Sequence, residues 1–127
     1  MARSYRELLV WQKAKALAVY TYKVTEQFPK NETYGLTSQV RRAAVSVVSN
    51  IAEGQGRLTS GEFLHFPGQA RGSLLELDTQ TAIALDLNYL KPDQYEVLDR
   101  DAYQVLGLLN RLIESLRKGR SQPGQKP

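Results

Sequence analysis

The segment Ser-Asn-Ile-Ala-Glu-Gly-Gln-Gly-Arg, residues Ser49 to Arg57, contains a Gly-x-Gly pair that could cradle a phosphate group. A dinucleotide-binding loop needs Gly-x-Gly-x-x-Gly after a strand, and a P-loop needs Gly-Lys-Ser or Gly-Lys-Thr. Gly54 and Gly56 follow a predicted helix and have neither feature. We interpret the pair as a hinge between helices, with Gly54 as the left-handed residue past the helix end. Arg57 beside the next helix N-terminus could still contact a phosphate.

His65 is the only histidine and the first side chain to consider for acid–base chemistry. A general base needs a positioned partner and a cleft, and the sequence identifies neither. No Gly-x-Ser-x-Gly elbow is present, and Glu62 to His65 gives one Glu-x-x-His spacing where a di-metal bundle uses two. The chain has no cysteine, which excludes disulfides and thiolate metal sites. The sequence therefore predicts no enzymatic activity, no metal and no cofactor.

The charge is unevenly distributed along the chain. The net charge is +4, but residues 1–73 hold ten Lys and Arg against five acids, residues 74–116 hold three against eight, and residues 117–127 hold four against none. A basic surface could gather nucleic-acid phosphates. Alternatively, the basic half of one subunit could face the acidic half of the next in an oligomer. A third interpretation is a solvated surface with no particular partner.

Apolar residues recur at spacings of three and four in four segments, which predicts four helices and no strands. Short connections between long helices favour an antiparallel up-down four-helix bundle, an all-α fold. Residues 1–118 are predicted to form this single domain, and residues 119–127 a disordered basic tail. The stripe predicted to be buried in the first helix consists of Val10, Ala14, Leu17, Thr21, Val24 and Phe28, and a second apolar face adds Trp11, Ala18 and Tyr22.

Helix boundaries are predicted from capping residues and breakers. Thr33 is a candidate N-cap of the second helix, and Thr37 and Ser38 compete with it. Thr59-Ser60-Gly61-Glu62 has the form of a capping box before the third helix. Pro67-Gly68 lies about two turns further on, which predicts a kink or a broken first segment. Pro92 suits the first position of the fourth helix.

The sequence also bears on cellular location. No apolar run approaches the roughly 20 residues needed to cross a bilayer. The N-terminus, Met-Ala-Arg-Ser-Tyr-Arg-Glu, has no signal-peptide core. We therefore expect a cytoplasmic protein that does not insert into a membrane.

Several motifs resemble the four-helix-bundle family of 23S rRNA intervening-sequence proteins. They are Leu36-Thr-Ser-Gln-Val-Arg-Arg-Ala-Ala-Val-Ser, the segment Ser49 to Arg57, Gly72-Ser-Leu-Leu-Glu-Leu-Asp-Thr79, and the opening from Leu8 to Ala14. The resemblance spans roughly residues 5–116. A related member is the accessory variability determinant protein of diversity-generating retroelements, which partners a reverse transcriptase and binds nucleic acid. The resemblance implies an up-down bundle, assembly into a ring-shaped homopentamer with basic surface, and no enzymatic activity. Two departures are Val48, where the family tends to have proline, and Pro67-Gly68, where it keeps a continuous apolar helix.

Two groups of residues are predicted to matter. In the first, Asn50, Glu53, Glu76 and one arginine of the Arg41-Arg42 pair form a polar network between the second and third helices, because buried polar groups must be hydrogen-bonded. The full structural motif is Arg42, Asn50, Glu53, Gly54, Gly56, Glu62 and Glu76. The second group holds the candidate phosphate contacts: Arg3, Arg6, Lys13, Lys15, Arg41, Arg57, Arg71, Arg117, Lys118 and Arg120.

The leading hypothesis is a non-enzymatic, oligomeric accessory protein that binds RNA or DNA mainly through phosphates, independently of base sequence. The alternative is a scaffold that docks a partner enzyme such as a reverse transcriptase, with its basic charge consumed at subunit interfaces. Catalysis through His65 is a third option.

Overall fold

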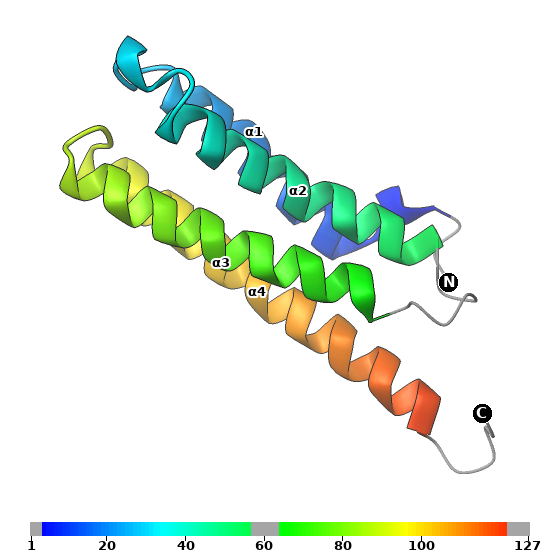
Figure 1. The fold of residues 1–127 in the computed structure, drawn as a ribbon. Helices are drawn as coiled ribbons and strands as arrows, with labels where there is room; N and C mark the ends of the chain where they lie inside the picture. The colour runs from blue at the N-terminus through cyan, green and yellow to red at the C-terminus, as the bar shows by residue number, and fades with distance from the viewer. Residues whose placement is uncertain (1–3, 57–63, 122–127) are drawn as a thin grey trace.

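The computed structural model describes residues 4–56 and 64–121, and within these ranges every regular element is a helix. Because consecutive helices run in opposite directions, the structure is the antiparallel up-down bundle predicted from the sequence (Figure 1). Its elements are the 3-10 turn η1 (Tyr5–Glu7), α1 (Leu9–Thr25), the 3-10 turn η2 (Lys30–Glu32), α2 (Leu36–Gly56), α3 (His65–Asp86) and α4 (Pro92–Ser121).

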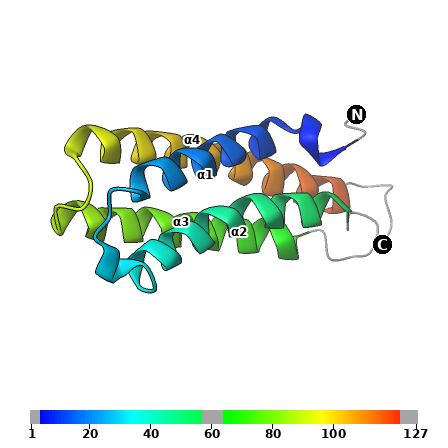
Figure 2. The ribbon, with the colours of Figure 1, turned by 90° about the horizontal axis from the view of Figure 1, so that it is seen from above.

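The four helices form a square in which α1 packs on α2 and α4, and α3 packs on the same two helices. The α1/α2 pair therefore makes one face of the bundle and the α3/α4 pair makes the opposite face (Figure 1). η1, the end of α2, the start of α3 and the end of α4 all lie at one end of the molecule, as Figure 2 shows from above. The η2 turn and the α3–α4 turn lie at the other end.

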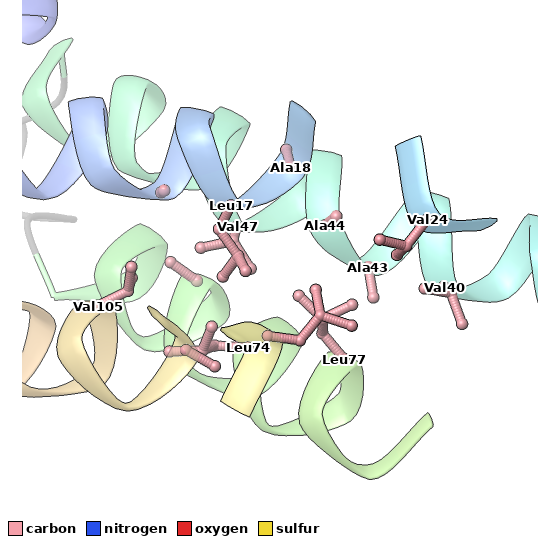
Figure 3. Packing of buried hydrophobic residues seen from close by; sticks show 14 of the residues in the cluster. Leu17, Ala18, Val24, Val40, Ala43, Ala44, Val47, Leu74, Leu77 and Val105 are labelled. Atoms are coloured by element: carbon pink, nitrogen blue, oxygen red, sulfur yellow. The ribbon is translucent and has the colours of Figure 1, made fainter. Parts of the chain in front are cut away.

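The core fills the space between the four helices with aliphatic side chains. Leu17, Val47, Leu74 and Val105 converge there from the four different helices, and each is at most 2% exposed (Figure 3). All six residues of the stripe predicted for the first helix are buried, which confirms that part of the sequence analysis. Thr21 is tolerated among them because its hydroxyl donates to the carbonyl of Leu17, 2.8 Å away.

Gly54 has a different role from the one predicted. It was predicted to lie past the end of the second helix, but α2 continues to Gly56 and Gly54 is buried within it. A Cβ atom at Gly54 would lie 3.1 Å from Cδ of Pro67 and 3.3 Å from Cβ of Phe66. The glycine is thus required by the close approach of α2 to the start of α3, and the left-handed interpretation was wrong.

Pro67 does not kink α3, contrary to the prediction. The helix begins at His65, so Pro67 lies in its first turn. A backbone N–H in the first turn has no acceptor within the helix, so proline loses no helical hydrogen bond there. The backbone N–H of Gly68 already donates to the carbonyl of Leu64 at 3.1 Å. The later start of α3 makes the proline compatible with a regular helix. The predicted capping box, Thr59–Glu62, lies outside the described residues.

The start of α2 is capped by a residue that the sequence analysis did not consider. The carboxylate of Glu32 accepts a hydrogen bond from the backbone N–H of Leu36 at 3.0 Å, whereas the Thr33 hydroxyl donates backward to Lys30. The hydroxyl of Thr37 is buried without a partner among the described residues. None of the three predicted caps therefore caps α2, because the intervening η2 turn brings the longer glutamate side chain into position.

The α3–α4 connection agrees with the prediction of a turn. Asn88 adopts a left-handed conformation with φ of 63°, a region that asparagine tolerates better than most residues. The next helix starts at Pro92, as predicted. It then extends to Ser121, three residues into the segment predicted as a disordered tail. Residues 122–127 lie outside the described residues.

Candidate nucleic-acid interface

Cationic side chains gather at the end of the bundle that holds η1 and the C-terminal part of α4. An even number of antiparallel helices returns the chain to its starting end, so residues far apart in sequence meet there (Figures 1 and 2). We call this region the basic end. Its described cations are Arg6, Lys13, Arg71, Arg111, Arg117 and Lys118, against the acids Glu7, Glu53 and Glu114.

The opposite half of the bundle has the reverse balance, with nine acids against six cations. The acids are Glu26, Glu32, Glu76, Asp78, Asp86, Asp93, Glu96, Asp99 and Asp101, and the cations are Lys23, Lys30, Arg41, Arg42, Lys91 and Arg100. We call it the acidic end. Two hydrogen bonds, from the Leu36 backbone N–H and the Tyr89 hydroxyl, lower the pKa of Glu32 and keep it ionised. The charge imbalance seen along the sequence thus becomes an imbalance along the length of the bundle.

The predicted phosphate contacts at the basic end differ in how freely they can reach a ligand. Arg6, Lys13 and Lys118 are exposed. Arg71 is half-buried and donates to the side-chain oxygen of Asn110 at 3.0 Å, which fixes its direction but leaves other donors of its guanidinium group. Arg117 is exposed on the last turns of α4. Arg3, Arg57, Glu62 and the side chain of Arg120 lie outside the described residues.

Arg41 has a structural position. Its Nε donates to the Thr25 hydroxyl at 2.8 Å and its Nη2 to the Tyr22 carbonyl at 3.1 Å. The guanidinium carbon lies 4.6 Å from the centroid of the Tyr22 ring. Arg41 therefore fastens α2 to the C-terminal turn of α1, where carbonyl groups need donors. Arg41 was predicted to contact phosphate, but these interactions direct its guanidinium group toward α1.

The polar link between α2 and α3 is formed mainly by serines. The Ser46 and Ser73 hydroxyl groups are 2.8 Å apart, and the Asn50 amide donates to both the carbonyl and the hydroxyl of Ser46, at 2.8 and 3.0 Å. The prediction that Asn50 takes part in a network here is confirmed. The serine pair was missed, because serines in a helix give no sequence signal that distinguishes a buried link from a solvated surface.

Two other predicted members of the network lie beside this link. Arg42 and Glu76 are exposed and line a groove of about 670 Å³ above the serine pair. Glu53 is exposed near the end of α2. Gly56, predicted to belong to the hinge after the second helix, is the last residue of α2.

A second groove, which we call the α1/α2 groove, was not predicted. It has a volume of about 420 Å³ and an apolar floor, and it is flanked by two lysines. Val19, Tyr22 and Val45 are 46%, 42% and 44% exposed within it. Its lining residues are Lys15, Ala18, Val19, Tyr22, Lys23, Val45, Val48 and Ser49. The only sequence signal was the second apolar face of the first helix.

Two carboxylates meet on the opposite face of the bundle. Asp78 of α3 and Asp99 of α4 line a small recess together with Leu75 and Tyr103, which are 50% and 78% exposed. Burial, followed by the hydrogen bond to Asp99 and its negative charge, raises the pKa of Asp78 to about 6. Burial and the charges of Asp99, Asp78 and Asp86 raise the pKa of Tyr95 nearby. We call the surface around Leu75, Asp78, Asp99 and Tyr103 the acidic face.

His65 is exposed at the start of α3 and packs edge-on against Phe66, with ring centroids 4.8 Å apart. It lines a shallow groove with Gly68, Gly72 and Glu76. Within residues 4–56 and 64–121, no group of three or more His, Cys, Asp or Glu side chains could hold a metal ion. None of the helices in those ranges has the length and apolar character required to span a membrane.

Comparison with known proteins supports the fold and places the chain in a family. No curated protein matches the chain. A crystal structure from Bacteroides thetaiotaomicron VPI-5482, described as a protein of unknown function from the S23 ribosomal protein family, superposes with a TM-score of 0.76. It is 20% identical in sequence, and the match covers 84% of this chain and 96% of that one, so the likeness establishes the bundle fold alone. The sequence profile described as 23S rRNA-intervening sequence protein matches residues 6–111, and the chain therefore belongs to this family.

Proposed function

We propose that this protein is a non-enzymatic, oligomeric accessory protein that binds RNA or DNA through the phosphate backbone. The observation that carries the proposal is the basic end, where six described cations from η1, α1, α3 and α4 face three acids. Such a concentration of positive charge attracts a polyanion without reading its bases. The protein acts in the cytoplasm and forms a homo-oligomer, a ring-shaped pentamer by its resemblance to the family.

The proposed binding mode requires contacts that are spread over one end of the molecule. Arg6, Lys13 and Lys118 offer exposed charges from η1, α1 and α4, and Arg71 of α3 reaches Asn110 of α4. Lysine supplies a point charge, whereas the arginine guanidinium can form a bidentate contact with a phosphate. Aromatic rings at this end are tied into local packing, such as Tyr5 against Trp11 at 5.3 Å, so base stacking is not part of the proposal.

Filter binding of structured RNA and of duplex DNA at about 50 and 200 mM salt tests this proposal. For about four phosphate contacts, affinity should fall by on the order of 10²-fold between the two concentrations. The double variant Lys13→Glu/Lys118→Glu should lose binding to both ligands. Lys30→Glu/Lys91→Glu, which makes the same charge change at the acidic end, is the matched control and should bind more strongly than the first variant. Lack of retention of wild-type complexes at 50 mM salt would refute the proposal.

A second candidate function is a scaffold that docks a partner enzyme, and it is favoured by the exposed apolar floor of the α1/α2 groove. This function predicts no retention of nucleic acid by the isolated protein at either salt concentration. It also predicts that substitutions in the groove, but not those at the basic end, abolish complex formation with the partner.

A further inference from the structure

The bundle carries two exposed surfaces that combine apolar side chains with charge of opposite sign. One is the α1/α2 groove, with Val19, Tyr22 and Val45 between Lys15 and Lys23. The other is the acidic face, with Leu75 and Tyr103 beside Asp78 and Asp99. Each of these surfaces leaves apolar area in contact with water, which marks it as a candidate contact site.

The groove is surrounded by basic residues, and the acidic face mainly by acids. Of the cations near the acidic face, Arg100 pairs with Asp101 at 3.3 Å, and Arg71, one turn before Leu75, donates to Asn110 at 3.0 Å. Residues 9–25 of α1 and 36–52 of α2 contain no acidic residue, while Arg41 and Arg42 lie close to the groove, against Tyr22 and in the adjoining α2/α3 groove. Around the acidic face, Glu96 lies on the same side of α4 as Asp99 and Tyr103, and Asp86 contributes further negative charge near Tyr95. Contact between surfaces of this kind joins apolar burial with electrostatic complementarity.

We infer that the α1/α2 groove of one copy of this chain receives the acidic face of a second copy. The inference rests on the self-association within the proposed function and names its two surfaces. Because α1/α2 and α3/α4 are opposite faces of the square, the contact joins two different patches. It leaves the acidic face of the first copy and the groove of the second copy free. Such a heterologous contact repeats from copy to copy and closes into a ring when the rotation between copies permits.

The inferred contact assigns separate roles to the cations. Lys15 and Lys23 become covered by the neighbouring copy, so Lys15 is removed from the set of phosphate contacts proposed from the sequence. The cations of the basic end do not line the groove, and the inferred contact leaves them uncovered. The oligomer therefore concentrates several basic ends in one particle, which strengthens binding to a long polyanion by multivalency.

A charge-swap experiment in the absence of nucleic acid tests the inference. Variant A carries Lys15→Glu and Lys23→Glu, and variant B carries Glu96→Lys and Asp99→Lys. In each variant alone, the groove and the acidic face carry charge of the same sign, so two copies repel each other. Each variant should therefore elute at the monomer mass of 14.3 kDa in size-exclusion chromatography with light scattering. A third variant carries all four substitutions, which makes the groove acidic and the opposing surface basic. Opposite charges then meet again at every contact, whatever the number of copies, and this variant should recover the wild-type oligomer mass.

Controls separate loss of association from loss of folding. Circular dichroism should show full helicity and cooperative melting for A and B. Val45→Asp, at a side chain 44% exposed in the groove, should also give a folded monomer. Lys30→Glu and Glu114→Lys change charge outside both surfaces and should leave the oligomer mass unchanged.

Three outcomes would overturn the inference: a monomeric wild type, variants A and B that keep the wild-type mass, or a folded variant with all four substitutions that stays monomeric. A monomeric wild type that binds a purified partner protein through the groove would assign the surface to that partner instead. Nucleic-acid binding is measured separately with the variants of the basic end, so the two proposals can fail independently.

Discussion

Asp78 and Asp99 place two carboxyl groups together between α3 and α4, and the resulting rise in the pKa of Asp78 to about 6 makes stability depend on pH. Between about pH 4 and pH 6 the folded chain binds more protons at Asp78 than the unfolded chain does. The free energy of unfolding therefore falls as the pH rises through this window, and above it the folded state retains the full cost of the second charge.

The substitution Asp78→Asn should raise the free energy of unfolding at pH 7.5 and flatten its dependence on pH between 4 and 6. The gain should be about 1 kcal/mol or less, because the pair is partly open to solvent, which screens the repulsion. Urea denaturation across this pH range measures the effect. Glu114→Gln, which removes an exposed carboxylate elsewhere on α4, is the matched control. A variant with the same pH slope as the wild type would contradict the assignment.

Among elements, the contact between the end of α2 and the start of α3 depends most on a single residue. Gly54→Ala should destabilise the fold by about 1–3 kcal/mol, because the added Cβ would lie 3.1 Å from the Pro67 ring, which cannot move independently of its backbone. Gly72→Ala is the matched change, since a Cβ there meets nothing within 4 Å. It should stabilise by about 0.5–1 kcal/mol through higher helix propensity. Chemical denaturation gives both values, and stabilisation by Gly54→Ala would refute the proposed close approach.

The contrast between these glycines also shows what the sequence could predict. Helical periodicity identified four helices and the buried stripe of α1, because amphipathic spacing reports burial directly. It could not distinguish a glycine that ends a helix from one that lets a second helix approach, because that depends on where Pro67 packs. The same limitation applies to Glu32, whose capping of α2 depends on the η2 turn, and to Arg41, whose partners come from another helix. The candidate site could not be predicted from the sequence, because its cations come from distant segments of the chain that meet only in the folded bundle.

At the scale of the whole molecule, the separation of charge between the two ends has opposite consequences for folding and for association. Folding brings cations together at one end and acids at the other, so like charges repel one another within each end. This repulsion extends further at low salt, because the screening length is about 30 Å at 0.01 M and about 8 Å at 0.15 M. The exposed pair of Arg100 and Asp101, 3.3 Å apart, offsets little of it. Association instead joins a basic groove to an acidic face, so salt weakens it.

Raising the salt concentration from about 0.01 to 0.15 M should therefore raise the melting temperature of the monomeric Val45→Asp variant by about 2 °C, equivalent to roughly 0.5 kcal/mol. The same change should shift the wild type from oligomer toward monomer in light scattering. Lys118→Glu in the Val45→Asp background reduces the repulsion at the basic end and should diminish the rise in melting temperature. A fall in melting temperature with salt would mean that attractive pairs outweigh the repulsion within each end, and the basic end would then have too little uncompensated charge to hold a polyanion.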